Sequence, residues 1–163
     1  MNQTIENILP MLRRFAYSLT GNSADADDLV QTSLEKMLTK PVPTGVEVTK
    51  WAFKVCRNVW IDEYRAQKVR QNATRKPELQ EQQSIDESSN FEQKELLLQV
   101  NQAMSQLPDE QRAILALVAV QGMSYKDVAR SMEIPLGTVM SRLSRARSTL
   151  LTLIKPQQIG AEL

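Results

Sequence analysis

The stretch GMSYKDVARSMEIPLGTVMSRLSRAR, residues 122–147, contains two helical patterns separated by a break. The first pattern begins after Ser124, whose hydroxyl can cap a helix, and Asp127 stands where a capping box places a carboxylate. Pro135 and Gly137 are expected to end that helix before a second one starts. Two short helices joined by a tight turn predict a helix-turn-helix, whose second helix has the size that enters the major groove of DNA.

The second helix, expected to start near Thr138, has an apolar stripe opposite a polar, cationic face. The stripe recurs at every third or fourth residue, as Val139, Leu143, Ala146 and Leu150. The outer face has no acidic residue, and its members are Thr138, Ser141, Arg142 and Arg145. An ordinary helical hairpin is the alternative, but a merely solvated face usually carries both signs of charge. The pattern favours a DNA-reading surface, with Arg142 and Arg145 pointing away from the core.

Composition excludes several classes of function. The 163 residues include 20 Lys and Arg against 19 Asp and Glu, so any nucleic-acid surface must be local rather than spread over the molecule. The absence of His excludes imidazole catalysis, Ser-His triads and His metal ligands. A single cysteine, Cys56, excludes a disulfide framework and a multi-cysteine metal site. Composition therefore leaves no histidine or multi-cysteine site for catalysis or metal binding, and we expect no cofactor and no metal.

The length and the residue types predict an all-α protein of two small helical domains joined by a flexible linker. Five Gly and few aromatics, beside many Leu, Ala, Gln, Glu, Lys and Arg, are typical of helical chains. The N-terminal MNQTIENILPMLRRF lacks the uninterrupted apolar core of a signal peptide. Because no apolar run approaches the length of a membrane span, we expect a cytoplasmic protein without membrane insertion.

The first domain, residues 1–71, should begin with helices at about 5–19 and 23–38. Gly21 suits a left-handed position after the first helix, and Ser23 is expected to cap the second. The predicted buried faces contain Ile8, Leu9, Leu12, Phe15, Ala16, Leu19, Ala26, Leu29, Val30, Leu34, Met37 and Leu38.

Three carboxylates, Asp25, Asp27 and Asp28, crowd the first turns of the second helix. A metal or acid–base site is one reading of them. The positive end of the helix dipole already favours carboxylates there, and no partner ligand is visible, so we reject that reading. The outward residues of this helix are Asp28, Gln31, Thr32 and Glu35.

A third helix is expected at about 48–69, with a core stripe of Ala52, Val55, Cys56 and Val59. Its other residues interleave aromatic rings with cations: Trp51, Lys54, Arg57, Asn58, Trp60, Ile61, Tyr64, Arg65 and Lys68. Such a surface suits single-stranded nucleic acid, because rings stack on bases while cations neutralise phosphates. For Trp60 and Tyr64 core packing is an equal alternative, whereas for Trp51 the functional role is favoured.

Residues 72–93 are polar and mainly acidic, and they predict a flexible linker that cannot form a packed core. The second domain, residues 94–163, should open with a helix whose apolar residues are Leu96, Leu97, Val100, Ala103, Met104 and Leu107. A helix at 109–121 follows Pro108 and is apolar nearly all round, so it should be the buried centre of this domain.

Four segments, in this order and spacing, resemble bacterial RNA polymerase sigma factors of the extracytoplasmic-function (ECF) group, in the sigma-70 family. They are DADDLVQ at 25–31, WAFKVCRNVWIDEYR at 51–65, LPDEQRAILAL at 107–117 and the helix-turn-helix at 122–147. The resemblance covers nearly all of the chain and implies a promoter-specificity factor without catalytic activity. It implies core RNA polymerase as a partner, through the clamp helices of β′ and the flap of β, together with promoter DNA and an anti-sigma factor.

The resemblance also implies site residues. The residues that it implies for docking on core polymerase are Asp25, Asp27, Asp28, Gln31 and Glu35. The residues that it implies for promoter melting and for reading the single-stranded −10 element are Trp51, Lys54, Arg57, Asn58, Ile61 and Arg65. The residues that it implies for reading the −35 element in the major groove are Thr138, Met140, Ser141, Arg142, Ser144 and Arg145. Asn58 matches the family's position in the pocket for a flipped base. Met140 and Ser144 depart from common residues of the family, so the bases read there stay open.

Two other functions remain as alternatives. A stand-alone helix-turn-helix regulator would explain the second domain, but it normally needs dimerisation, and no heptad seam is present. A protein-interaction module that has lost DNA binding predicts that charge reversal of Arg142 and Arg145 changes nothing. The first alternative leaves the first domain and the linker without a role.

Overall fold

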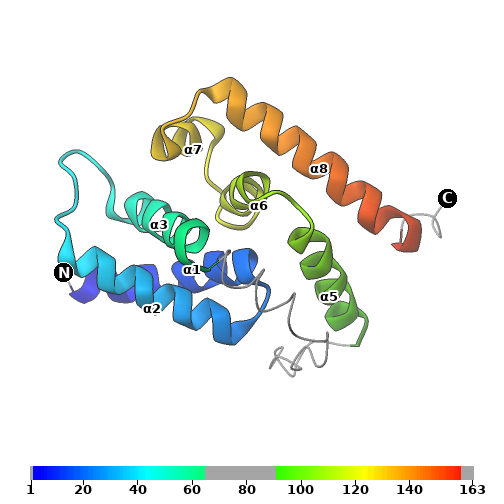
Figure 1. Ribbon diagram of the computed structural model, residues 1–163, viewed down its shortest axis with the longest axis horizontal. Helices are drawn as coiled ribbons and strands as arrows, with labels where there is room; N and C mark the ends of the chain where they lie inside the picture. The colour runs from blue at the N-terminus through cyan, green and yellow to red at the C-terminus, as the bar shows by residue number, and fades with distance from the viewer. Residues whose placement is uncertain (1, 65–90, 159–163) are drawn as a thin grey trace. The chain divides into compact units, whose positions relative to one another are not determined.

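The computed structural model describes residues 2–64 and 91–158, and every element in these two ranges is a helix (Figure 1). The chain separates into two compact units, residues 1–83 and 84–163, and each is described by itself. The prediction of two helical domains is therefore confirmed for the described residues. The predicted linker lies outside them as far as residue 90, and its last three residues belong to a helix. Its flexibility and the domain boundaries stay predictions.

Within residues 2–64, the first unit has three packed α-helices and one π-helical turn. In chain order they are α1 (Asn2–Thr20), α2 (Ser23–Thr39), α3 (Val48–Val59) and η1 (Trp60–Tyr64). Phe15 of α1 and Phe53 of α3 meet edge to face at the centre, with ring centroids 5.3 Å apart. Aromatic pairs prefer this geometry, so the contact joins the first helix to the third.

The connection between α1 and α2 is a compact turn with a reciprocal cap. Gly21 has a positive φ of 77° and donates its N–H to the Tyr17 carbonyl at 2.7 Å, as predicted for a left-handed residue. Asn22 accepts a hydrogen bond from the Asp25 N–H through Oδ1 and donates from Nδ2 to the Asp25 carboxylate, both at 2.8 Å. The prediction that Ser23 is the cap was wrong, since Asn22 precedes the helix with extended backbone and Ser23 is its first residue.

The apolar pattern placed most of the first unit's core correctly. Leu9, Leu34 and Val55 are only half-buried. Leu38 was predicted to be buried and is 64% exposed in the last full turn of α2. Phe53 is buried although it was not in the predicted stripe. Each error lies at the margin of an apolar face, where the neighbouring helices decide what is covered.

The predicted helix 48–69 is not one regular helix. The α-helical part ends at Val59, and the backbone then widens into η1. The Trp60 N–H lies at the junction and donates to the carbonyls of both Arg57 and Cys56. Such π-helical insertions often occur at functional sites. Residues 65–69 of the prediction lie outside the described residues.

Within residues 91–158, the second unit has four α-helices and another π-helical turn. In chain order they are α5 (Phe91–Ser105), α6 (Asp109–Leu115), η2 (Ala116–Val120), α7 (Tyr125–Met132) and α8 (Leu136–Gln158). The predicted helix 109–121 is thus divided after Leu115. Residues 113–117 are buried, as expected for the centre of the domain, whereas Val120 is exposed.

Two features of this unit were not expected. Leu96, Leu97 and Leu98 of α5 are partly exposed, so only the end of that helix, at Ala103 and Met104, joins the core. Arg112 of α6 is buried. Burial lowers the pKa of its guanidinium to about 10, and the nearby Asp109 carboxylate partly offsets that effect.

The turn between α7 and α8 forms the helix-turn-helix, but not as predicted. Ser124 caps α7 by accepting the Asp127 N–H at 3.1 Å, which confirms the predicted cap. Glu133, not a glycine, reverses the chain with a left-handed φ of 57°. The Pro135 carbonyl then accepts the N–H groups of Thr138 and Val139 in the first turn of α8, and Gly137 lies inside that helix instead of breaking it.

Candidate nucleic-acid interface

The outer face of α8 has exposed polar and apolar side chains over a buried stripe. Val139, Leu143 and Ala146 are buried, as predicted, and Leu150 is half-buried. Thr138 is half-buried, and the residues exposed on the outer face are Met140, Ser141, Ser144 and Arg145. Because α8 contains no Asp or Glu, no carboxylate of this helix opposes a phosphate-bearing ligand.

Arg142 does not point freely away from the core, so that part of the prediction was wrong. Its Nη1 lies 3.3 Å from Oε2 of Glu110, which comes from the first turn of α6. Each of the two side chains is 33% exposed. The pair joins α8 to α6 and keeps the Arg142 side chain against α6. The neighbouring cation Arg145 is exposed.

Three further cations of the helix-turn-helix were missed by the sequence analysis. Arg147 of α8 is exposed, and its Nη1 donates to the Tyr125 hydroxyl at 3.4 Å, which links the two helices. Lys126 and Arg130 of α7 are also exposed. Their spacing of four residues puts them on one side of α7, and that spacing was the signal that could have revealed them.

The carboxylates of α2 divide into a structural and an exposed group. Asp25 is half-buried and takes part in the cap of its own helix with Asn22. The residues exposed along the helix are Asp27, Asp28, Gln31 and Glu35. Asp27 lies 3.6 Å from Nε of Arg13, in a pair with both side chains more than half exposed. In the described ranges, no cluster of His, Cys, Asp or Glu could hold a metal ion.

The predicted single-strand surface lies on α3 and η1. Trp51, Lys54, Asn58 and Ile61 recur at intervals of three and four residues, and all are half-buried. Arg57 is also half-buried. Trp60, whose role was left open, is 6% exposed and belongs to the core. Arg65 and the side chain of Tyr64 lie outside what the structure describes.

Asn58 is already hydrogen-bonded by its neighbour in the chain. Nη1 of Arg57 donates to Oδ1 of Asn58 at 2.7 Å. A hydrogen bond from a charged donor is short and strong compared with a neutral one. The amide that the family resemblance places in a base pocket is therefore held by a cation from the same helix.

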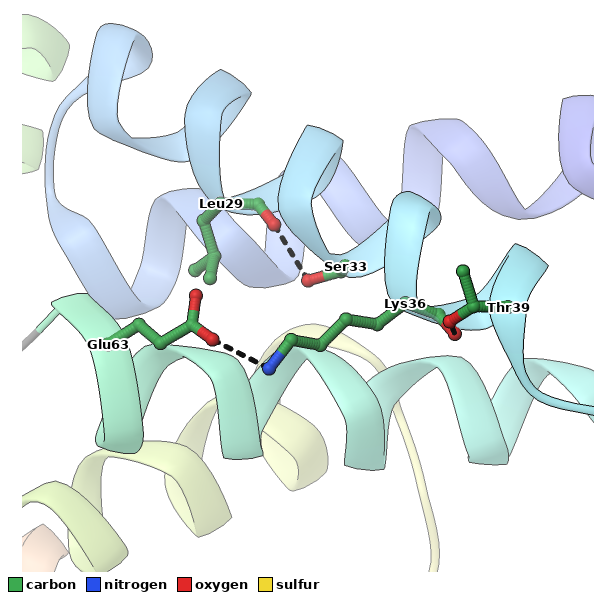
Figure 2. A network of polar contacts seen from close by, with 5 residues as sticks. All are labelled: Leu29, Ser33, Lys36, Thr39 and Glu63. Carbon is green, nitrogen blue, oxygen red and sulfur yellow. Dashed lines mark hydrogen bonds and ion pairs between the residues drawn. The ribbon is translucent and has the colours of Figure 1, made fainter.

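An ion pair connects α2 to η1, as Figure 2 shows. Nζ of Lys36 lies 2.6 Å from Oε1 of Glu63, and each side chain is 44% exposed. Ser33, one turn earlier on α2, is buried and donates its hydroxyl to the Leu29 carbonyl at 2.7 Å. The Lys36–Glu63 pair attaches the π-helical turn to α2, whereas the Ser33 bond lies within α2 itself.

The single cysteine is part of the core and not a reactive site. Cys56 is fully buried on the inner side of α3. Burial raises the pKa of its thiol to about 12, and a hydrogen bond with Ser33 acts in the opposite direction. At neutral pH the thiol is therefore protonated and poorly nucleophilic.

No helix in residues 2–64 or 91–158 is both long and apolar enough to cross a membrane.

Comparison with known proteins matches both units to one family. A family model described as "Sigma-70 region 2" matches residues 4–70, and one described as "Sigma-70, region 4" matches residues 97–150. The ECF RNA polymerase sigma factor EcfG of Rhodopseudomonas palustris is 34% identical over 151 residues, covering 90% of this chain and 80% of that protein. The ECF RNA polymerase sigma factor SigL of Mycobacterium tuberculosis is 34% identical over 156 residues, covering 92% and 85%.

Solved structures agree with this assignment. The sigma factor RpoE, crystallised in complex with the anti-sigma factor NepR from Bartonella quintana, matches with a TM-score of 0.75 and 30% identity, covering 96% of this chain and 98% of that chain. A chain in the complex of the anti-anti-sigma factor PhyR with NepR, also from Bartonella quintana, has a TM-score of 0.65. Its identity of 19% supports the fold alone, and the match covers 94% of this chain and 50% of that chain.

Proposed function

The chain belongs to the extracytoplasmic-function group of RNA polymerase sigma factors, and from this premise we propose how its two units divide promoter recognition. It is a promoter-specificity factor. The observation that carries the proposal is the helix-turn-helix of α7 and α8, whose second helix exposes a polar outer face without any carboxylate. A helix of that kind fits the major groove.

The second unit reads the −35 element as duplex DNA. Met140, Ser141, Ser144 and Arg145 are the exposed candidates for contacts with base edges, and Arg145 can donate two bonds to a guanine. Exposed cations beside them serve phosphates: Lys126, Arg130 and Arg147. Thr138, in the first turn of α8, is the candidate for a contact with the DNA backbone at the edge of the groove. Arg142 acts mainly by positioning α8 through Glu110.

The first unit reads the −10 element after the strands separate. Trp51 and Ile61 offer apolar surface for stacking, while Lys54, Arg57 and Arg65 neutralise phosphates. Asn58 hydrogen-bonds the exposed edge of a base that has left the stack. Extruding a base costs a few kcal/mol, and these contacts offset that cost.

The exposed edge of α2 docks on core RNA polymerase. Asp27, Asp28, Gln31 and Glu35 form an acidic strip that suits a cationic partner surface, here the clamp helices of β′. Asp25 supports that strip indirectly, through its two hydrogen bonds with Asn22, the cap of the helix. The second unit contacts the flap of β.

A protein partner regulates these surfaces. The similar factor RpoE was crystallised with the anti-sigma factor NepR, and an anti-sigma factor that covers the same surfaces would silence this chain. The chain catalyses no reaction itself. It works in the cytoplasm, where the polymerase and the chromosome are.

The experiment is transcription in vitro by core polymerase, with and without this protein, on genomic fragments. We expect start sites that appear only with the protein and that share sequences near −35 and −10. The free protein should bind duplex DNA weakly, because its near-neutral charge limits counterion release. Tight, specific binding by the free protein without new start sites would favour a stand-alone regulator.

A further inference from the structure

The hydrogen bond between Arg57 and Asn58 constrains the orientation of the asparagine amide. Consecutive residues on a helix do not face each other, so the long arginine has to fold back to reach its neighbour at 2.7 Å. Arginine has donors and no acceptor, so it can bond only to the oxygen end of the amide. The nitrogen end, with its two N–H donors, is then turned away from Arg57.

The amide's orientation decides which bases it can recognise. An amide free to turn over offers a base either an acceptor or donors. When Arg57 holds the amide oxygen, Asn58 offers a base mainly its N–H donors. The base must then supply hydrogen-bond acceptors. On their Watson–Crick edges, cytosine and thymine each carry two acceptor atoms, whereas adenine and guanine each carry one. A flipped base is read on that edge, so the held amide fits a pyrimidine better.

We propose that Arg57 is a positioning residue that makes Asn58 select a pyrimidine over a purine in the single-stranded −10 element. The proposal rests on the proposed role of Asn58 in reading a flipped base. Arg57 acts here through the asparagine, in addition to any contact it makes with a phosphate. The two actions differ in their effect, because a lost phosphate contact weakens binding to all sequences alike and leaves base preference unchanged.

Two substitutions of similar length separate the two actions. Arg57→Gln removes the charge and keeps an N–H donor on a shorter side chain. Arg57→Met removes both the charge and the donor. Both variants should weaken phosphate binding equally, so a difference between them reports the hydrogen bond to Asn58. The residue is half-buried, and thermal melting of each variant checks that the fold is retained.

The measurement uses holoenzyme, assembled from core polymerase and the full chain, on promoters with a pre-melted −10 region. The non-template strand of that region is randomised, and sequencing of bound DNA gives the ratio of pyrimidine to purine at each position. Asn58→Ala identifies the position that the asparagine controls. At that position we expect the wild type and Arg57→Gln to keep the ratio, and Arg57→Met to lower it about tenfold.

Each contrary result has a distinct meaning. If Arg57→Met keeps the ratio while Asn58→Ala loses it, the positioning role is wrong and the role of Asn58 stands. If Arg57→Gln and Arg57→Met lower the ratio equally, an uncharged N–H donor at position 57 does not replace arginine, and the positioning role through this hydrogen bond is again wrong. If Asn58→Ala changes no position, the proposed function of Asn58 fails, and the role of Arg57 fails with it.

Discussion

The outer face of α8 and the surface of α3 both carry candidate DNA contacts, but they present them differently. On α8 the side chains of Met140, Ser144 and Arg145 are exposed above a buried stripe. On α3 the comparable residues are half-buried, and Asn58 is held by Arg57. Reading a groove requires side chains that reach outward, whereas holding one extruded base requires a partly enclosed amide of fixed orientation. The difference fits duplex reading by one unit and single-strand reading by the other.

The largest expected effect tests whether the two surfaces belong to independent units. Leu143→Ala removes a fully buried side chain under the outer face of α8 and should destabilise the second unit by about 2–5 kcal/mol. The adjacent control, Ser144→Ala, is exposed and should change stability by less than about 0.5 kcal/mol. Thermal unfolding followed by circular dichroism measures both.

The single cysteine shows which unit responds. Cys56 is buried in the first unit, and its thiol, with a pKa of about 12, should react with an alkylating reagent at pH 8 only when that unit opens. We expect Leu143→Ala to leave the labelling rate unchanged. A parallel increase in labelling would mean that the two units unfold together.

A second substitution should prevent both DNA surfaces from acting at the promoter, because it weakens the binding of the protein to core polymerase. Asp28→Arg puts a cation in the acidic strip of α2 and should weaken binding to core polymerase more than tenfold, or about 1.4 kcal/mol. Glu6→Arg on α1 makes the same change of charge at another exposed site and should bind normally. Fluorescence anisotropy with labelled protein measures both affinities. Normal binding by Asp28→Arg would contradict the proposal that this side of α2 docks on core polymerase.

The division between duplex and single-strand reading is tested by opening the promoter in advance. Arg145→Ala should cost about 1–3 kcal/mol in promoter recognition, whether the −10 region is paired or pre-melted. Asn58→Ala should impair transcription from the duplex promoter and be partly rescued by the bubble, because strand opening no longer limits it. Transcription by holoenzyme from the two templates gives the comparison. An identical response of both variants would contradict the division.

The smallest expected effect concerns the two cations of α8. Arg142 is paired with Glu110, so Arg142→Ala should affect promoter recognition less than Arg145→Ala. The pair is partly exposed, and a double-mutant cycle with Glu110→Ala should give a coupling energy of about 0.2–1 kcal/mol. Chemical denaturation measures this coupling. A loss of promoter recognition as large as that of Arg145→Ala would show that Arg142 leaves Glu110 and reaches DNA.

Local pattern was sufficient for the helices, several of their ends and most of the core. The recurrence of Val139, Leu143 and Ala146 follows from the helical repeat, and the Ser124 cap follows from bonds within a few residues. The family, too, was recognisable from motifs that are continuous in the sequence. Such features depend on neighbours in the chain, so the order of the amino acids by itself determines them.

Tertiary packing decided the features that depend on distant partners. Arg142 and Arg145 look equivalent along α8, and only Glu110, 32 residues away, distinguishes them. The sequence did not decide whether Trp60 is in the core or on the surface, and the packing of the helices buries it. The contact of η1 with α2 depends on Lys36 and Glu63, which are far apart in the chain. Periodicity predicts which side of a helix is apolar. It does not contain the positions of other helices, and those positions determine which side chains are covered, paired or left exposed.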